Sequence, residues 1–350
     1  MKKNIFLTSI ILLFCFNITA QVTDVVTGLN EPVGLAISGN DLYIGEYGGG
    51  SISKIDITET TPTLQTVLTN LTNPWHLKLK NNELYISHFW LSEVIKIDIT
   101  QVTPTVVTVL SSSLSGPSGL EFNGNDLYIS DWNNAVIYAI DITASPVVVT
   151  TVTSNLGGPT GLLLNGNDLF IADFFGNKIS RIDISQSTPT VVDIVTGVSE
   201  PDGIVLYGND LYIAEFRSNR ISKIDITSNN PILETVITGL SGPTGLVLSG
   251  DELYIAERTG NKVSKINLTT LSVNDVSQSN SIKIYPNPSS NSLTVSQLKE
   301  TVNYKLYNVL GEELDNGTII NNHKIDIQNL AKGIYFLKLE NGNTVKFLKN

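Results

Sequence analysis

The chain has 350 residues and a formal net charge of −11, from 33 acidic and 22 basic side chains. This excess of acids disfavours nucleic acid and anionic membranes as partners, because both require basic patches that contact phosphate. Cys15 is the one cysteine and Met1 the one methionine. Without its first twenty residues the chain could form no disulfide, thiol nucleophile or thiolate metal site.

Residues 1–20 have the pattern of a cleavable secretory signal peptide. Lys2 and Lys3 precede an apolar run at 5–18, and small residues close the segment. A short positive start before an apolar core is typical of such signals. Cys15 suggests a lipoprotein signal instead, but Phe14 stands where that class needs a small residue. No later stretch approaches ~20 apolar residues, so we expect no integral membrane segment in the mature chain.

A repeat fills the region 21–270. Successive copies are spaced 42 or 43 residues apart, measured between Pro32, Pro74, Pro117, Pro159, Pro201 and Pro243. Each copy contains four short apolar runs separated by Gly-, Asn- or Pro-containing turns, which predicts four strands and no helix. Four strands in ~40 residues are typical of one β-propeller blade. The predicted fold class is therefore all-β, with a six-bladed β-propeller over 21–270.

The last repeat lacks its fourth apolar run, and a matching run stands at the start of the propeller. The sixth copy loses its pattern after VSKINLT at 263–269, whereas VTDVVTGL at 22–29 matches ETVITGL at 234–240. We expect the N-terminal strand to complete the last blade, because a closed ring leaves no unpaired blade edge.

The chain changes character after residue 270. The polar stretch 271–280 is rich in Ser and Asn and is expected to be a linker. Short alternating runs from 281 to 350 predict a small β-sandwich of ~70 residues. Several motifs occur in it in order: YPNP at 285–288, YNVLG at 307–311, Leu330 with GIY at 333–335, and Lys346 in the last run.

These motifs resemble the C-terminal sorting domain of the type IX secretion system of Bacteroidetes. The resemblance implies export by the signal peptide and then by the tail, with the type IX machinery as partner and a secreted or cell-surface location. The alternative is an ordinary terminal β-module. The repeat phrase P-x-G-L…N-D-L-Y-I-A-D…N-K-I-S-K-I-D resembles the NHL repeat and the six-bladed gluconolactonase/regucalcin-like propellers. Because these propellers host many activities, this second resemblance implies the fold and leaves the function open.

Both ends of the first hairpin of each repeat are expected on one face of the ring, since the chain enters at the proline and returns at an acid. Aromatic residues follow that acid in most copies. The candidate ligand-binding residues at this mouth are Trp75, His76, His88, Phe89, Trp90, Trp132, Phe174, Phe216 and Arg258, with Tyr47 and Phe175 on the same rim. The alternative is structural: the aromatics fill wedges between blades, and the acids bond the amides of adjoining loops.

The second copy, NPWHLKLKNNELYISHFW, departs most from the others. His76 replaces the Gly after the proline and residue x, and His88 replaces the acid. With a turn at Asn81-Asn82 the two histidines would be opposed or one step diagonal, within ~5–8 Å. Such a pair could share a metal, pass a proton or bind an anion, unless it is structural.

Carboxylates at the same mouth are candidate ligands for Ca²⁺ or another divalent cation, which prefers oxygen donors. The candidates are Glu46, Asp131, Asp173, Asp202, Glu215 and Glu257. In the gluconolactonase-like family the residue after the blade proline often supplies a ligand, and Asp202 in EPDG is the one position that matches the family's P-D-G. Val33, Ser118 and Thr160 stand where that family has a glutamate or asparagine. No nucleophile elbow, HExxH helix or phosphate loop occurs.

Two functions remain open at this level. The first is a module that binds a glycan or peptide on an acidic, aromatic-rimmed face, and we favour it. The second is a divalent-metal-dependent lactonase, hydrolase or lyase. Convergence of His76, His88, Asp131 and Asp202 within metal-bonding reach would favour the second.

Overall fold

The computed structural model describes residues 22–111, 113–269, 283–296, 298, 301–309, 311–340 and 344–350. The chain divides into two compact units, Met1–Leu271 and Ser272–Asn350. The expected signal peptide at 1–20 and the whole of the expected linker at 271–280 lie outside the described residues. Among the described residues no helix is long and apolar enough to cross a membrane.

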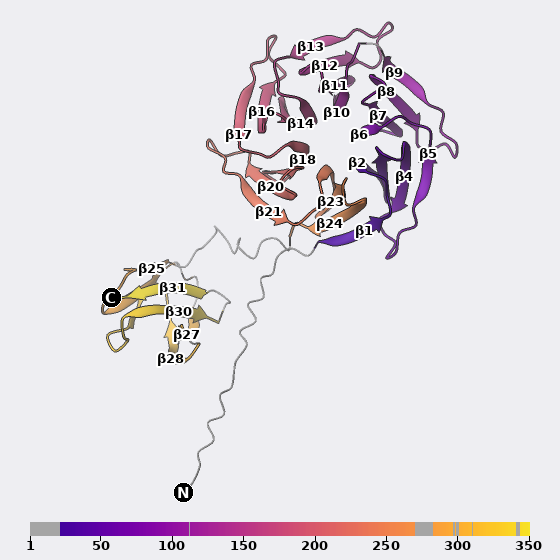
Figure 1. Ribbon diagram of the computed structural model, residues 1–350. Coiled ribbons are helices and arrows are strands. Elements are labelled where there is room, and N and C mark those ends of the chain that lie inside the picture. The colour runs from indigo at the N-terminus through magenta and orange to yellow at the C-terminus, as the bar shows by residue number, and fades with distance from the viewer. Residues whose placement is uncertain are drawn as a thin grey trace. The chain divides into compact units, whose positions relative to one another are not determined.

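The all-β prediction is confirmed, and residues 22–269 form six four-stranded sheets arranged as blades around a ring (Figure 1). The innermost strands are β2 (Pro32–Ser38), β6 (Pro74–Lys80), β10 (Pro117–Asn123), β14 (Pro159–Asn165), β18 (Pro201–Tyr207) and β22 (Pro243–Ser249). The second strands are β3 (Asp41–Glu46), β7 (Glu83–His88), β11 (Asp126–Asp131), β15 (Asp168–Asp173), β19 (Asp210–Glu215) and β23 (Glu252–Glu257).

The two outer positions complete each blade. The third strands are β4 (Ser51–Asp56), β8 (Glu93–Asp98), β12 (Val136–Asp141), β16 (Lys178–Asp183), β20 (Arg220–Asp225) and β24 (Lys262–Asn267). The outermost strands are β5 (Gln65–Leu68), β9 (Val107–Ser111), β13 (Thr150–Thr153), β17 (Val192–Thr196), β21 (Glu234–Thr238) and, in the sixth blade, β1 (Thr23–Thr27).

The sixth blade joins the two ends of the propeller. β1 pairs antiparallel with β24, from Thr23 opposite Lys265 to Thr27 opposite Lys262. Lys262 Nζ also lies 2.6 Å from Asp24 Oδ1. Val26 of β1 is buried in one apolar cluster with residues of the first and sixth blades, Leu42 and Ile44 among them. The N-terminal strand therefore supplies both backbone pairing and core packing to the last blade.

Every blade has a β-bulge at the entry of its innermost strand. In the second blade Pro74 lies opposite His88, but the next regular pair is Leu77 with Ile86, and the same shift recurs in the other five. The blades come very close at the bulge. A Cβ on Gly119 would collide with the carbonyl oxygen of Thr160 in the next blade, which explains the glycine there.

The second unit is a two-sheet β-sandwich. One sheet has the order β25 (Lys283–Tyr285), β26 (Ser292–Ser296), β29 (His323–Asp326), and the other has the order β28 (Glu313–Ile319), β27 (Val302–Asn308), β30 (Gly333–Leu339), β31 (Thr344–Lys349). Leu293, Leu306, Leu337 and Phe347 are buried between the two sheets in one cluster.

Candidate functional site

Aromatic side chains form a continuous contact chain at the proline end of the innermost strands. The proline of each blade lies opposite the last residue of the second strand, as Pro32 lies opposite Glu46. The residue after that one then projects beside the mouth of the ring. The six residues at this position are Tyr47, Phe89, Trp132, Phe174, Phe216 and Arg258. The sequence predicts these residues at one mouth of the ring, and ring contacts link the five aromatic ones, Tyr47 through Trp75.

Trp75 is the centre of this aromatic cluster. Its ring centroid lies 5.2 Å from that of Tyr47, 5.2 Å from that of Phe89 and 6.1 Å from that of Trp132. The chain continues from Trp132 to Phe174 at 4.7 Å and on to Phe216 at 6.1 Å. Trp75 is only 7% exposed, and its Nε1 has no hydrogen-bond partner among the described residues. Trp75 therefore packs the mouth from within.

Two further aromatics pack on this layer and face solvent. Trp90 is 62% exposed and Phe175 is 60% exposed. Trp90 Nε1 donates to the hydroxyl of Tyr47 at 2.7 Å, and Phe175 packs edge-on against Trp132 at 5.1 Å. These contacts hold both side chains in place although neither is buried. We call Tyr47, Trp75, Phe89, Trp90, Trp132, Phe174, Phe175 and Phe216 the aromatic rim.

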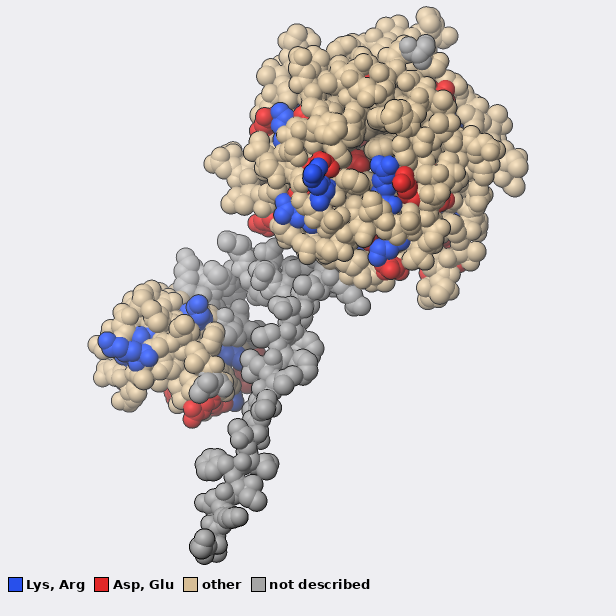
Figure 2. All heavy atoms as spheres, viewed as in Figure 1, with Lys and Arg blue, Asp and Glu red and all other residues tan. Residues whose placement is uncertain are grey.

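Arg258 occupies the sixth position of the ring, where the other blades have an aromatic. Its guanidinium lies 4.4 Å from the ring centroid of Tyr47 and 5.2 Å from that of Trp75, distances at which a cation is attracted to an aromatic face. Arg258 also pairs with Glu31 at 3.2 Å, and Arg217 pairs with Glu200 at 2.9 Å. On the face of the ring shown in Figure 2, charged side chains are sparse and lie mostly in pairs of opposite sign around a central hollow.

The carboxylates at the ends of the second strands bond their own loops. Each accepts a hydrogen bond from the backbone amide sixteen residues earlier in the chain. The five residues are Glu46, Asp131, Asp173, Glu215 and Glu257. Each is buried. Among the described residues no group of three or more His, Cys, Asp or Glu side chains could hold a metal ion. The contacts of these acids thus match the structural alternative, and the acids do not form a common site.

His88 takes the place of such an acid in the second blade. It is 3% exposed, and its Nδ1 lies 3.0 Å from Glu93 Oε1. Burial lowers the pKa of His88, although the neighbouring Glu93 acts in the opposite direction. In the fifth blade the same two positions hold Glu215 and Arg220, at 2.6 Å. The second blade therefore has the acidic and basic partners exchanged.

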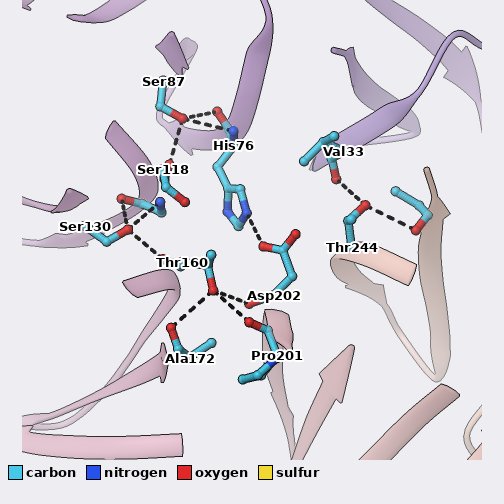
Figure 3. Close-up of polar contacts among 12 residues, drawn as sticks. Val33, His76, Ser87, Ser118, Ser130, Thr160, Ala172, Pro201, Asp202 and Thr244 are labelled. Carbon is cyan, nitrogen blue, oxygen red and sulfur yellow. Dashed lines mark hydrogen bonds and ion pairs between the residues drawn. The ribbon is translucent and has the colours of Figure 1, made fainter. Parts of the chain in front are cut away.

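His76 does not meet His88. Its Nε2 donates to Asp202 Oδ1 at 3.1 Å, a bond that joins the second blade to the fifth across the ring (Figure 3). The register of the hairpin explains why the predicted pairing of the two imidazoles is not found. Leu77 lies opposite Ile86, so His76 is beside Ser87, whose Oγ accepts from its backbone amide, while His88 lies opposite Pro74. His76 and Asp202 do come together, whereas His88 and Asp131 each bond within their own blade.

The residues around the His76–Asp202 bond do not fit a divalent cation. The second residues of the innermost strands are Val33, Trp75, Ser118, Thr160, Asp202 and Thr244. They offer one carboxylate, and that carboxylate already accepts from an imidazole. Thr160 and Thr244 donate their hydroxyls to backbone carbonyls of Pro201 and Pro32 in neighbouring blades. A hard cation needs six or more oxygen ligands, about 2.3 to 2.6 Å away for Ca²⁺, and this ring does not provide them.

One charged pair in the channel was not singled out from the sequence. Lys78 Nζ lies 2.7 Å from Glu121 Oε2, between the innermost strands of the second and third blades. Comparison of the repeats could have found it, because the same column holds Ala36, Leu163, Val205 and Val247 in the other blades. Two charged residues at a repeat position that is otherwise aliphatic indicate a role specific to those two blades.

Comparisons with known proteins agree with the architecture of both units. Residues 283–350 match the family model described as the secretion system C-terminal sorting domain. No curated protein sequence matches the chain. The propeller has the fold of a virginiamycin B lyase from Staphylococcus aureus, with a TM-score of 0.54 and 20% sequence identity, over 71% of this chain and 99% of the lyase.

Two other solved structures have the same fold. An auxiliary nutrient binding protein from Bacteroides thetaiotaomicron aligns with a TM-score of 0.57 and 14% identity, over 68% of this chain and 69% of that protein. A putative gluconolactonase aligns with a TM-score of 0.60 and 10% identity, over 71% and 92% respectively. At these identities the likeness establishes the fold alone. The chain thus consists of a β-propeller and a C-terminal type IX secretion sorting domain, and the sorting domain makes it a secreted or cell-surface protein.

Proposed function

We propose that the propeller binds a glycan on the aromatic rim. The observation that carries this proposal is the exposure of Trp90 and Phe175 above a layer of aromatics that they contact. Large aromatic side chains that stay exposed on a rigid surface commonly mark a binding site. Tyr and Trp are also suited to this role because they bury a large apolar area and lose little conformational entropy.

The electrostatics of the mouth favour a sugar over a cationic peptide. The acids that could attract a cation are buried and already accept hydrogen bonds from loop amides, as Glu215 does from Ser199. The cations at the mouth, Arg258 and Arg217, are themselves paired with glutamates. A ligand would therefore meet apolar rings with few free charges. The C–H faces of a pyranose ring can stack on such rings, and sugar hydroxyls can bond the polar groups around them.

The Bacteroides neighbour described as an auxiliary nutrient binding protein accords with this proposal. Its likeness to this chain extends to the fold alone, and the exposed aromatics of the rim carry the proposal. A metal-dependent lactonase or lyase is the other function expected from the gluconolactonase-like resemblance. The donor set around Asp202 counts against it, because the one carboxylate of that ring is bonded to His76.

An array that carries both glycans and peptides tests the proposal on the chain from residue 21 onward. We expect binding to glycans, and we expect the double variant Trp90→Ala, Phe175→Ala to lose affinity by about tenfold or more, equivalent to about 1.4 kcal/mol. Ile232→Ala is the matched control, because Ile232 is 75% exposed but lies outside the rim. Binding to peptides alone, or glycan binding that the double variant retains, would contradict the proposal.

A further inference from the structure

The central channel holds a cavity on the side of the His76–Asp202 bond away from the blade prolines. This cavity has a volume of about 240 Å³ and is lined by the innermost strands of all six blades. Its lining begins at the bulge, with residues such as Gly34 and His76, and runs away from the prolines that adjoin the aromatic rim. The cavity and the rim are therefore at opposite ends of the innermost strands.

The walls of this cavity are mainly aliphatic, with one charged pair. Lys78 and Glu121 line it and bond each other at 2.7 Å. The side chain of Glu121 is only 8% exposed. At the same register the other four blades carry Ala36, Leu163, Val205 and Val247, so the fold does not require charge here.

The pair is also a poor device for stability. Burying the Glu121 carboxylate costs free energy, whereas the Lys78 side chain is still 34% exposed. Replacing a buried ion pair by packed apolar residues is often neutral or stabilising. Four of the six blades have apolar residues at this position. The presence of Lys78 and Glu121 in the other two therefore calls for a role other than holding the blades together.

The hydrogen-bonding capacity of the pair indicates what it could bind. Both oxygens of Glu121 are engaged, one by Lys78 Nζ and the other by the backbone amide of Phe122 at 3.0 Å. An ammonium group has three N–H donors, and Glu121 is the one hydrogen-bond partner of Lys78 Nζ in the described part of the propeller. What remains available in the cavity is thus donor capacity from a cation, which is complementary to an anionic acceptor.

We propose that this cavity binds a small organic carboxylate. The carboxylate accepts from the free N–H groups of Lys78, Glu121 fixes the position of the ammonium, and the apolar part of the ligand packs against walls such as Leu163 and Val205. The cavity is smaller than the roughly 300 to 1,000 Å³ typical of sites for drug-sized molecules, so the ligand is small. This site is independent of glycan binding at the aromatic rim.

Titration of the full chain with benzoate tests the inference, with benzamide as the uncharged counterpart of the same shape. We expect benzoate to bind at least about tenfold more tightly than benzamide. The double variant Lys78→Val, Glu121→Val should lose that binding by about tenfold or more and should keep its melting temperature within a few degrees, because sister blades already carry Val at this position. Isothermal calorimetry and thermal melting measure the two quantities.

A control removes a Lys–acid pair of the same bond length outside the channel, where the acid is more exposed than Glu121. Lys54 and Asp41 bond at 2.7 Å on the first blade, and the variant Lys54→Gln, Asp41→Asn should bind benzoate like the unaltered chain. If the Val variant fails to fold, Lys78→Gln removes the charge and keeps most of the side-chain volume. Benzoate binding no tighter than that of benzamide, or binding that survives loss of the Lys78 charge, would overturn the inference.

Discussion

The exchanged pair His88–Glu93 allows a prediction of how much stability the second blade loses when His88 is returned to the acid of the repeat. Replacing His88 by Asp, the residue of the third and fourth blades, would set a carboxylate beside Glu93 at a buried position. Two like charges about 4 Å apart repel by about 4 kcal/mol at an effective dielectric constant of about 20. The side chain of Glu93 is 22% exposed and can turn toward water. We therefore expect His88→Asp to lower the free energy of unfolding by only about 1 to 2 kcal/mol.

Exchanging both partners should restore the stability. The fourth blade has Asp173 opposite Lys178 and the sixth has Glu257 opposite Lys262. The double variant His88→Asp, Glu93→Lys would give the second blade the same arrangement. In thermal melts followed by circular dichroism, we expect a loss of about 3 to 6 °C in the single variant and recovery to within about 2 °C in the double variant. If His88→Asp alone melts at the same temperature as the double variant, the pair does not act as an exchanged ion pair.

Three further predictions concern the ring. The His76–Asp202 bond should appear in a double-mutant cycle: His76→Gly combined with Asp202→Asn should cost less than the sum of the two single changes by about 1 kcal/mol or more, and additive losses would show that the bond contributes nothing. Burial lowers the pKa of His88 below its unfolded value of about 6.5, so on acidification the unfolded state is protonated before the folded state. The folded protein is therefore destabilised at this residue as the pH falls. The free energy of unfolding of the unaltered chain should therefore fall relative to that of His88→Gln as the pH drops below about 6.5, with their difference at pH 8 as the reference. A difference that does not change with pH would contradict this. Deleting Thr23–Thr27 should lower the melting midpoint by more than about 5 °C, since it exposes β24 and removes Val26 from its cluster, and an unchanged midpoint would contradict closure by β1.

The repeat made most of the propeller predictable. Regular spacing, short apolar runs and turn residues are local signals, and they recur in each of the six copies. The strand that completes the sixth blade was also readable, because the missing run at one end of the propeller matched an extra run at the other. The tail motifs likewise indicated a sorting domain, which the family match confirms.

The site was less predictable because it depends on geometry between blades. Within its own hairpin His76 lies beside Ser87, and its imidazole bonds Asp202 of the fifth blade across the ring, a contact between distant repeats that no local pattern marks. The acids could be placed at the mouth from the sequence, but their bonding to loop amides was only one of two alternatives. The hub position of Trp75 follows from how three blades crowd one side chain, which a single repeat cannot indicate.

Intrinsic fluorescence tests glycan binding at the rim most directly, because the three tryptophans of the chain, Trp75, Trp90 and Trp132, all belong to the rim. A glycan that stacks on Trp90 must change the environment of that indole. We predict a saturable shift of the tryptophan emission whose midpoint agrees with the affinity from calorimetry, and its loss in the Trp90→Ala, Phe175→Ala variant. A glycan that binds by calorimetry and leaves the emission unchanged would place the binding site elsewhere on the molecule.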